Sequence, residues 1–337
     1  MKELINEEKN QEQNQEKNQE NKILVHKYQP LYFKDFEMEK GMRQMLETLV
    51  EIDDFNVLIT GNMGAGKTTL LNAIIREYYK DVASSLVNDN ILYINSLKEQ
   101  GIHYYRNDVK TFCQTSSSVP KKKKFVVLDD MDTINEQSQQ IFRNCIDKYK
   151  HNVHFISTCT NHQKIIETLQ SRLIGIRIKP LHRENLNSIM KKIILNEKIP
   201  MNEEVSQFIL NMSNSTTKIM IHYLEKCKLL NCQITMDIAK SICTNICFTS
   251  FQELNECLIQ KNLNPAIQIL YSIYEQGYSV MDILDNYFLF IKMTDTLSED
   301  QKYKIIPYLC KYISVFHNIH EDEIELALFT NNLISCF

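Results

Sequence analysis

Residues 55–68, FNVLITGNMGAGKT, decide the fold class of this chain. The first six residues are an apolar run that is typical of a buried strand. The last eight, from Gly61 to Thr68, fit the pattern G-x-x-x-x-G-K-[ST], and a helical pattern follows over Thr68–Tyr79. A strand, a glycine-rich turn and a helix in this order are the context in which that pattern holds phosphate groups. The chain has only seven glycines, and this turn contains three of them.

The turn predicts a binding site for a nucleoside triphosphate. Glycine allows backbone conformations that point successive N–H groups at one phosphate, and the positive end of the following helix adds to the attraction. Lys67 would reach the β- and γ-phosphates, Thr68 would hold Mg²⁺ through its hydroxyl, and Thr69 would contact the α-phosphate. We therefore expect ATP and Mg²⁺ as ligands. The expected loop residues are Gly61, Asn62, Met63, Gly64, Ala65 and Gly66.

Residues 125–132, FVVLDDMD, form a second apolar strand pattern that ends in carboxylates. We expect this strand to sit beside the phosphate loop, with Asp129 binding Mg²⁺ and Asp130 polarising the attacking water. The alternative is an acidic turn at a strand end. A GTPase would carry Asp-x-x-Gly here and Asn-Lys-x-Asp later, and the sequence has neither. The adjacent acids therefore favour an ATPase.

Strand-like runs alternate with helical patterns as far as residue 178, and helical spacing dominates after Pro180. The alternation predicts an α/β fold, in which a parallel sheet is covered on both faces. Residues 1–22 are mostly Glu, Asn, Gln and Lys, with little to bury, so we expect a disordered tail there. The expected domains are a nucleotide-binding domain at 23–178, a small helical domain at 179–247 and an all-α domain at 248–337.

The composition excludes several broad classes. No run of about 18 apolar residues occurs, so we expect no membrane-spanning helix, and the acidic N-terminus does not fit a secretory signal. The net charge of −4 excludes a uniformly basic nucleic-acid binder but not a local basic face. The ten cysteines form no Cys-x-x-Cys pair, which favours reduced, mostly buried thiols over a zinc site.

Four segments share a further pattern. They are 24–36 (LVHKYQP…FKDF), 95–112 (NSLKEQGI…R…KTF), 164–172 (KIIETLQSR) and 266–284 (AIQILYSIYEQGYSVMDIL). In this order they resemble segments of the small subunits of sliding-clamp loaders, the replication factor C type of AAA+ ATPase. The resemblance implies an AAA+ domain, then a helical lid and an all-α collar. Its departures include Asp130, where the family has Glu, and Leu173, where it has Cys.

The resemblance also assigns roles to single residues. Thr160 falls at the sensor-1 position, on the strand between the phosphate loop and the acidic strand, and Asn161 is the alternative. Arg172 falls on the arginine that reaches the ATP site of a neighbouring subunit, with a surface ion pair as the alternative. Lys218 takes the place of the sensor-2 arginine, or is a solvated helix lysine. The residues implied to line the adenine pocket are Val25 and Glu37.

Primer–template DNA is the nucleic-acid partner that the resemblance implies, bound through its phosphates. For each candidate cation, a solvated surface position is an equal alternative. We expect the basic run 121–124 to be a solvated loop. We expect part of the apolar surface after residue 251 to form a subunit interface, with core packing as the alternative. The candidate DNA contacts are Gly101, Ile102, Arg106, Lys110 and Arg143.

The resulting hypothesis is an ATPase subunit of a clamp loader, which uses ATP to open a ring-shaped sliding clamp and load it onto DNA. The implied partners are other clamp-loader subunits in a hetero-pentamer, the clamp and DNA, with no membrane. The implied location is the nucleus, or a viral replication compartment. One alternative is a scaffold subunit that binds ATP but hydrolyses it weakly, because the Asp130 side chain is short. Another is a different AAA+ remodelling ATPase that self-assembles into hexamers.

Overall fold

The computed structural model describes residues 22–95, 102–213, 215–244, 246, 248–294, 296–316 and 322–335. The chain divides into two compact units. The first runs to Lys198 and includes Ser213–Glu225, and the second comprises Ile199–Met212 and Lys226–Phe337. The expected tail, apart from residue 22, lies outside the described residues. Within those residues, no helix has both the length and the apolar character needed to cross a membrane.

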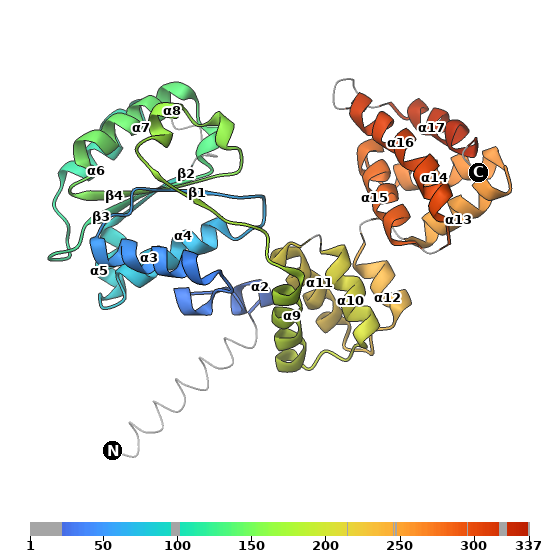
Figure 1. Ribbon diagram of the computed structural model, residues 1–337, viewed down its shortest axis with the longest axis horizontal. Coiled ribbons are helices and arrows are strands. Elements are labelled where there is room, and N and C mark those ends of the chain that lie inside the picture. The colour runs from blue at the N-terminus through green and yellow to red at the C-terminus, as the bar shows by residue number, and fades with distance from the viewer. Residues whose placement is uncertain are drawn as a thin grey trace, which may run out of the picture. The chain divides into compact units, whose positions relative to one another are not determined.

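A parallel sheet of five strands forms the centre of the first unit, which confirms the predicted fold class (Figure 1). The strand order is β2-β3-β4-β1-β5. The acidic strand β3 is therefore separated from β1 by β4, which confirms the expectation that the strand ending at Thr160 lies between the phosphate loop and the acidic strand. The strands are β1 (Val57–Thr60), β2 (Ile91–Asn95), β3 (Lys124–Asp129), β4 (Val153–Cys159) and β5 (Ile174–Arg177).

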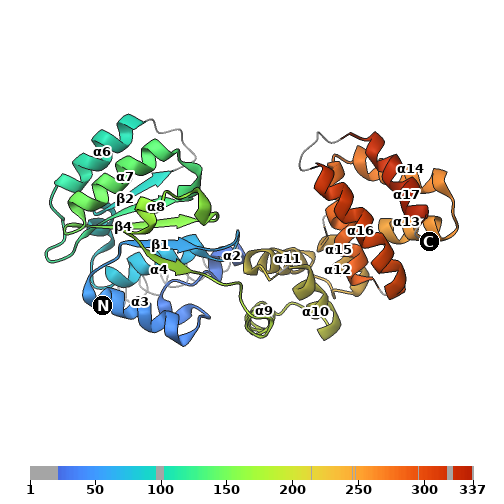
Figure 2. The same cartoon turned by 45° about the horizontal axis from the view of Figure 1, so that its top comes forward.

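Side chains alternate between the two faces of the sheet, and each face has its own apolar core. Val126 and Leu128 of β3 pack on the side covered by α6 (Ile102–Gln114) and α7 (Glu136–Tyr149). The opposite face buries Phe125 and Val127. Helices α3 (Lys40–Ile52) and α4 (Lys67–Tyr78) cover this face (Figure 2). The sequence pattern did not predict α3.

The first unit contains further short elements and the helices that follow the sheet. They are α2 (Leu24–Lys27), η1 (Phe33–Asp35), α5 (Ser84–Asp89), η2 (Met131–Thr133), η3 (His162–Lys164), α8 (Glu167–Gln170) and α9 (Arg183–Glu197). Helix α11 (Thr217–Leu230) begins in this unit.

Helices form the second unit, as predicted. A cluster of buried aromatic rings lies at its centre, where Phe251, Tyr287 and Phe290 pack together and Tyr287 donates a hydrogen bond to Asn255 (2.7 Å). Much of the apolar surface is thus core, while Tyr303 and Ile324 remain 72% and 60% exposed. The helices are α10 (Glu203–Met212), α12 (Met236–Ile242), α13 (Phe248–Ile259), α14 (Leu263–Glu275), α15 (Val280–Met293), α16 (Glu299–Phe316) and α17 (Ile324–Ile334).

The basic run 121–124 is not a solvated loop, and that expectation was wrong. Lys124 is only 4% exposed and donates to the carbonyl of Phe112 (3.2 Å). Lys123 pairs with Asp53 (3.0 Å), and Lys122 donates to the carbonyl of Tyr78 (3.0 Å). Long lysine side chains can cover apolar surface while their ammonium groups find oxygen partners, and three of these four do so.

A buried histidine holds the amino-terminal edge of the sheet together. The Nδ1 atom of His154 accepts a hydrogen bond from the backbone N–H of Phe55 (3.2 Å), so the proton lies on Nε2, which donates to Asp53 (3.1 Å). This neutral form satisfies both ring nitrogens. Burial lowers the pKa of His154 to about 4, although the charge of Asp53 opposes the shift.

We predict a loss of stability in mild acid that depends on His154. The pKa is lower in the folded chain than in the unfolded one, so the contribution is complete above pH 6.5 and is lost as the pH falls toward 4. The loss amounts to about 3 kcal/mol in the free energy of unfolding. In denaturant titrations between pH 6.5 and pH 4, the free energy of unfolding should fall less steeply with pH in His154→Asn than in the wild type. The exposed His151→Asn is the control, and an unchanged slope in His154→Asn would contradict the prediction.

Candidate active site

The loop between β1 and α4 requires its glycines. Gly64 and Gly66 have φ angles of +74° and +91°, a region that side chains rarely adopt. At Gly61 a Cβ atom would lie 3.0 Å from the carbonyl oxygen of Ile178. Gly66 also stands at the start of α4, so the backbone N–H groups of the first helical turn are available to an anion.

Lys67 lies at the centre of the candidate site and is only 8% exposed. Its Nζ atom donates to the loop carbonyls of Gly61 (3.0 Å) and Asn62 (3.2 Å). It also donates to Oγ1 of Thr160, 3.1 Å away at the end of β4. The structure therefore brings the loop lysine and the expected sensor-1 residue together. Asn161, the alternative, uses its side chain to cap η3 through Gln163 N.

Oxygen ligands suitable for Mg²⁺ gather beside this lysine. The hydroxyl of Thr68 lies 3.1 Å from Oδ2 of Asp129, and Thr158 donates to Oδ1 of the same carboxylate (2.5 Å). A carboxylate and a hydroxyl are the hard ligands that Mg²⁺ prefers, so these residues fit the ion. Thr69 follows in the first turn of α4 and is half-buried. Thr158 was not predicted, because nothing in an apolar strand sequence marks which residue faces the next strand's carboxylate.

Two further carboxylates lie on the turn after β3. Asp130 has a φ of +52°, and burial together with the negative charge of Asp129 raises the pKa of its carboxyl group. A raised pKa makes this carboxylate a better proton acceptor. Asp132 accepts hydrogen bonds from the backbone N–H groups of Thr160 (3.3 Å) and Asn161 (2.9 Å). Asp132 thereby fixes the turn that carries Thr160, the expected sensor-1 residue. The sequence analysis gave this third acid of the Asp-Asp-Met-Asp sequence no role.

The start of α11 covers the outer side of the phosphate loop. Loop residues 62–65 line a small cavity together with Pro180, Leu181 and residues 215–217. Lys218, the expected sensor-2 residue, follows directly in α11 and is exposed.

The two residues expected at the adenine lie before the sheet. Val25 is half-buried in α2, and Glu37 is exposed between η1 and α3. The roles of Val25, Glu37 and Lys218 stay predictions.

Arg172 lies just after α8, on the surface of the chain. Its Nε atom donates to Asp147 of α7 (2.6 Å), and Nη1 donates to the carbonyl of Thr168 (2.6 Å). Within the single chain, Arg172 therefore forms a surface ion pair, which is the alternative to its expected role at a neighbouring ATP site.

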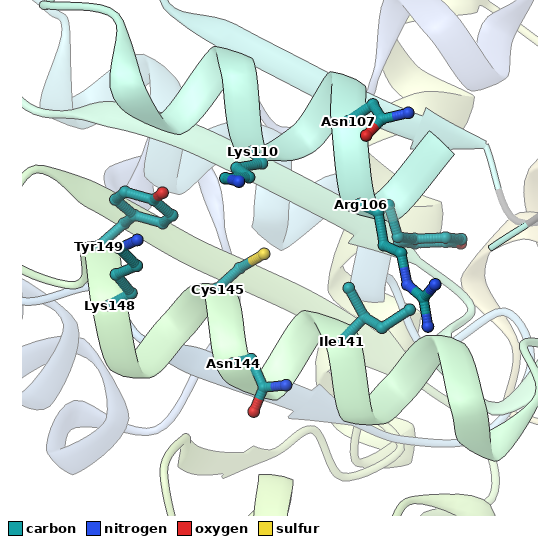
Figure 3. A pocket seen from close by; sticks show the side chains of 9 residues that line it. Arg106, Asn107, Lys110, Ile141, Asn144, Cys145, Lys148 and Tyr149 are labelled. Atoms are coloured by element: carbon teal, nitrogen blue, oxygen red, sulfur yellow. The ribbon is translucent and has the colours of Figure 1, made fainter. Parts of the chain in front are cut away.

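The candidate DNA contacts fall on α6 and α7. Arg106 and Lys110 line a groove of about 370 Å³ between the two helices, and Lys148, which was not predicted, lines its other side (Figure 3). Arg143 does not line this groove and donates to Asn144 (2.7 Å). Ile102 is the first residue of α6, and Gly101 lies outside the described residues.

Two family models match the chain in separate regions. The model described as ATPase family associated with various cellular activities (AAA) matches residues 57–180, and the replication factor C C-terminal domain matches residues 251–313. The chain therefore combines an AAA ATPase domain with a replication factor C C-terminal domain, and it is similar to replication factor C small subunits. Its phosphate loop and acidic strand are therefore those of an ATPase.

The similarity to replication factor C subunits extends along most of the chain. The protein named putative replication factor C small subunit R395, of Acanthamoeba polyphaga mimivirus, is 27% identical over 84% of this chain and 87% of its own length. Replication factor C subunit 4 of Saccharomyces cerevisiae is 26% identical over 84% and 86%.

Solved structures support the fold alone. The RuvB Holliday junction branch migration motor of Thermotoga maritima aligns with a TM-score of 0.51 and 15% identity, over 72% of this chain and 85% of RuvB. AMPPCP-bound DnaA of Aquifex aeolicus aligns with a TM-score of 0.51 and 16% identity, over 91% and 89%.

We predict that Gly64→Ala weakens ATP binding by about tenfold or more, since a non-glycine residue in the left-handed region costs roughly 1–2 kcal/mol. The new Cβ atom would also lie 2.6 Å from Cγ2 of Thr216. Adding Thr216→Ser removes that methyl group and should restore part of the affinity. Gly175→Ala is the control, because no heavy atom lies within 4 Å of its Cβ position. Equal affinities for Gly64→Ala and Gly175→Ala in a fluorescent-nucleotide titration would refute the prediction.

Proposed function

We propose that this chain is an ATP-driven subunit of a sliding-clamp loader, which helps to open a ring-shaped clamp and load it onto primer–template DNA. The observation that carries the proposal is the combination, in one chain, of the Lys67–Thr160 cluster with a C-terminal region of the replication factor C type. The first is a site for ATP, and the second is the region that distinguishes this family from other AAA+ proteins. The proposed domains are the AAA+ domain at 23–178, the lid at 179–247 and the collar at 248–337.

In the proposed mechanism the phosphate loop and Lys67 bind the triphosphate. Thr68 and Asp129 would hold Mg²⁺, which when bound would neutralise charge on the phosphate oxygens. Asp130 orients the attacking water, and Thr160 positions it next to the γ-phosphate. Val25 and Glu37 lie at the adenine, Thr69 at the α-phosphate and Lys218 at the γ-phosphate.

Arg172 is proposed to complete the ATP site of a neighbouring subunit. A guanidinium group has a fixed charge and forked donors that match a phosphoryl group in transfer. The ion pair with Asp147 lies on the surface, where such a pair contributes at most about 1 kcal/mol and is readily exchanged. Assembly can therefore redirect this arginine at small cost.

The proposed partners are other clamp-loader subunits in a hetero-pentamer, the clamp and primer–template DNA. Arg106, Lys110 and Lys148 are proposed to contact DNA phosphates from the groove between α6 and α7, with Ile102, Gly101 and Arg143 as the remaining candidates. We place the complex in the nucleus, or in a viral replication compartment.

The second candidate function is a scaffold subunit that binds ATP but hydrolyses it slowly. It is favoured by the short side chain of Asp130 and by its left-handed backbone. Single-turnover hydrolysis in the assembled complex, compared with Asp130→Glu, separates this candidate from the active ATPase.

We predict that Lys67→Ala abolishes ATP-dependent clamp loading. The variant removes the positive charge at the centre of the loop, so ATP affinity should fall by at least about a hundredfold. Binding of ATP and loading of a labelled clamp onto primed DNA are the measurements. The exposed Lys150→Ala is the control, and unchanged ATP binding by Lys67→Ala would contradict the site. Self-assembly into hexamers without clamp binding would instead favour a different AAA+ remodelling ATPase.

We predict that Arg172→Ala leaves ATP binding by its own chain intact but slows hydrolysis in the neighbour by about a thousandfold, as expected for an arginine that acts in trans. The measurements are ATP binding by the single chain and single-turnover hydrolysis in two reconstituted complexes, in which either the neighbour or this chain alone retains its phosphate-loop lysine. Asp147→Ala, which removes the ion pair but keeps the arginine, is the control. A similar defect in both variants, or a defect confined to the chain's own site, would refute the role in trans.

A further inference from the structure

The N-terminal segment formed by residues 24–28 is tied to two helices by buried or half-buried carboxylates. Glu197, the last residue of α9, accepts a hydrogen bond from the hydroxyl of Tyr28 (2.7 Å) and pairs with Nζ of Lys27 (2.7 Å). Glu225 of α11 accepts a hydrogen bond from the backbone N–H of Leu24 (3.2 Å). Helix α2 lies beside α9 and α11 in both views of the chain (Figures 1 and 2).

Glu197 has the chemistry of a fixed anchor. Its side chain is only 5% exposed and one of its oxygens binds both partners. Burial and the hydrogen bond to Glu197 raise the pKa of the Tyr28 phenol to about 12, so the phenol remains a donor across the physiological range. A buried carboxylate that lost its partners would remain desolvated without compensation, which is unfavourable. Movement of the segment away from Glu197 is therefore unfavourable as well.

The same contacts continue to the phosphate loop. Helix α11 carries Glu225, and the residue before its first turn, Thr216, lies so close to Gly64 that a Cβ atom there would be 2.6 Å from the Thr216 methyl group. The N-terminal segment thus joins the end of α9 to α11, and of these elements only the start of α11 lies against the loop. Every contact lies within the first compact unit.

We propose that Glu197 is a positioning residue of the nucleotide site. It does not reach the phosphate loop itself; it holds the segment that carries Val25 on the end of α9, and Glu225 ties the same segment to α11. The inference rests on the proposed function, in which Val25 lies at the adenine. It follows that Glu197 supports binding of the nucleoside part of ATP and has little effect on the triphosphate alone.

The test compares the binding of ATP and of inorganic tripolyphosphate by the full-length chain. Glu197→Ala should weaken ATP binding by about tenfold, a typical coupling between connected sites, and leave tripolyphosphate binding within about twofold of the wild type. Glu197→Gln keeps an oxygen that accepts the Tyr28 hydrogen bond, so its affinity for ATP should fall less, by about threefold. Glu184→Ala, at an exposed position in the first turn of α9, is the matched control.

The outcomes separate the inference from the proposed function. Equal weakening of both ligands by Glu197→Ala would indicate a general structural role and overturn the inference, as would an ATP affinity equal to that of Glu184→Ala. If Glu197→Ala does not fold, Tyr28→Phe serves as the second variant, with an expected loss of about threefold for ATP only. A wild-type chain that bound neither ligand would contradict the proposed function instead.

Discussion

The parallel register of β3, β4 and β1 is the constraint on which the site depends. Ile59 of β1 pairs with Thr158 of β4, and Leu128 of β3 pairs with Ser157. The carboxyl ends of the three strands therefore meet at one edge, where Thr158 reaches Asp129 and Thr160 reaches Lys67. A slip of one residue in β4 would turn these side chains to the opposite face and dismantle the cluster.

The two edges of the sheet use charge in different ways. At the carboxyl edge, Lys67 and Asp129 lie where the proposed triphosphate and metal ion would bring their own charges. At the amino edge, Asp53 neutralises Lys123 and accepts from His154, so the charges there are matched within the chain. These contacts join the end of α3 to β3 and β4, the strands whose opposite ends carry Asp129 and Thr160.

The sequence was informative where the chemistry needs particular residues at fixed spacing. The phosphate loop, the acidic strand and the alternation of strands and helices could be predicted because each depends on local pattern. No local pattern specifies that β4 lies between β1 and β3, and this order was predicted only through the resemblance to the replication factor C type. The prediction that the lysines at 122–124 are solvated was wrong because it also depended on contacts that the local sequence does not show. Charge predicts solvent exposure only when no oxygen acceptor is within reach, and here Asp53 and two backbone carbonyls are the acceptors.

The backbone at position 130 limits which acid can occupy it. Aspartate and asparagine tolerate the left-handed conformation better than residues with longer side chains, and Asp130 adopts it at φ +52°. A glutamate there would gain reach toward the water but would have to bear a higher conformational penalty. The length of the acid at position 130 is therefore linked to the backbone of the turn after β3, and a longer side chain there requires a change in that turn.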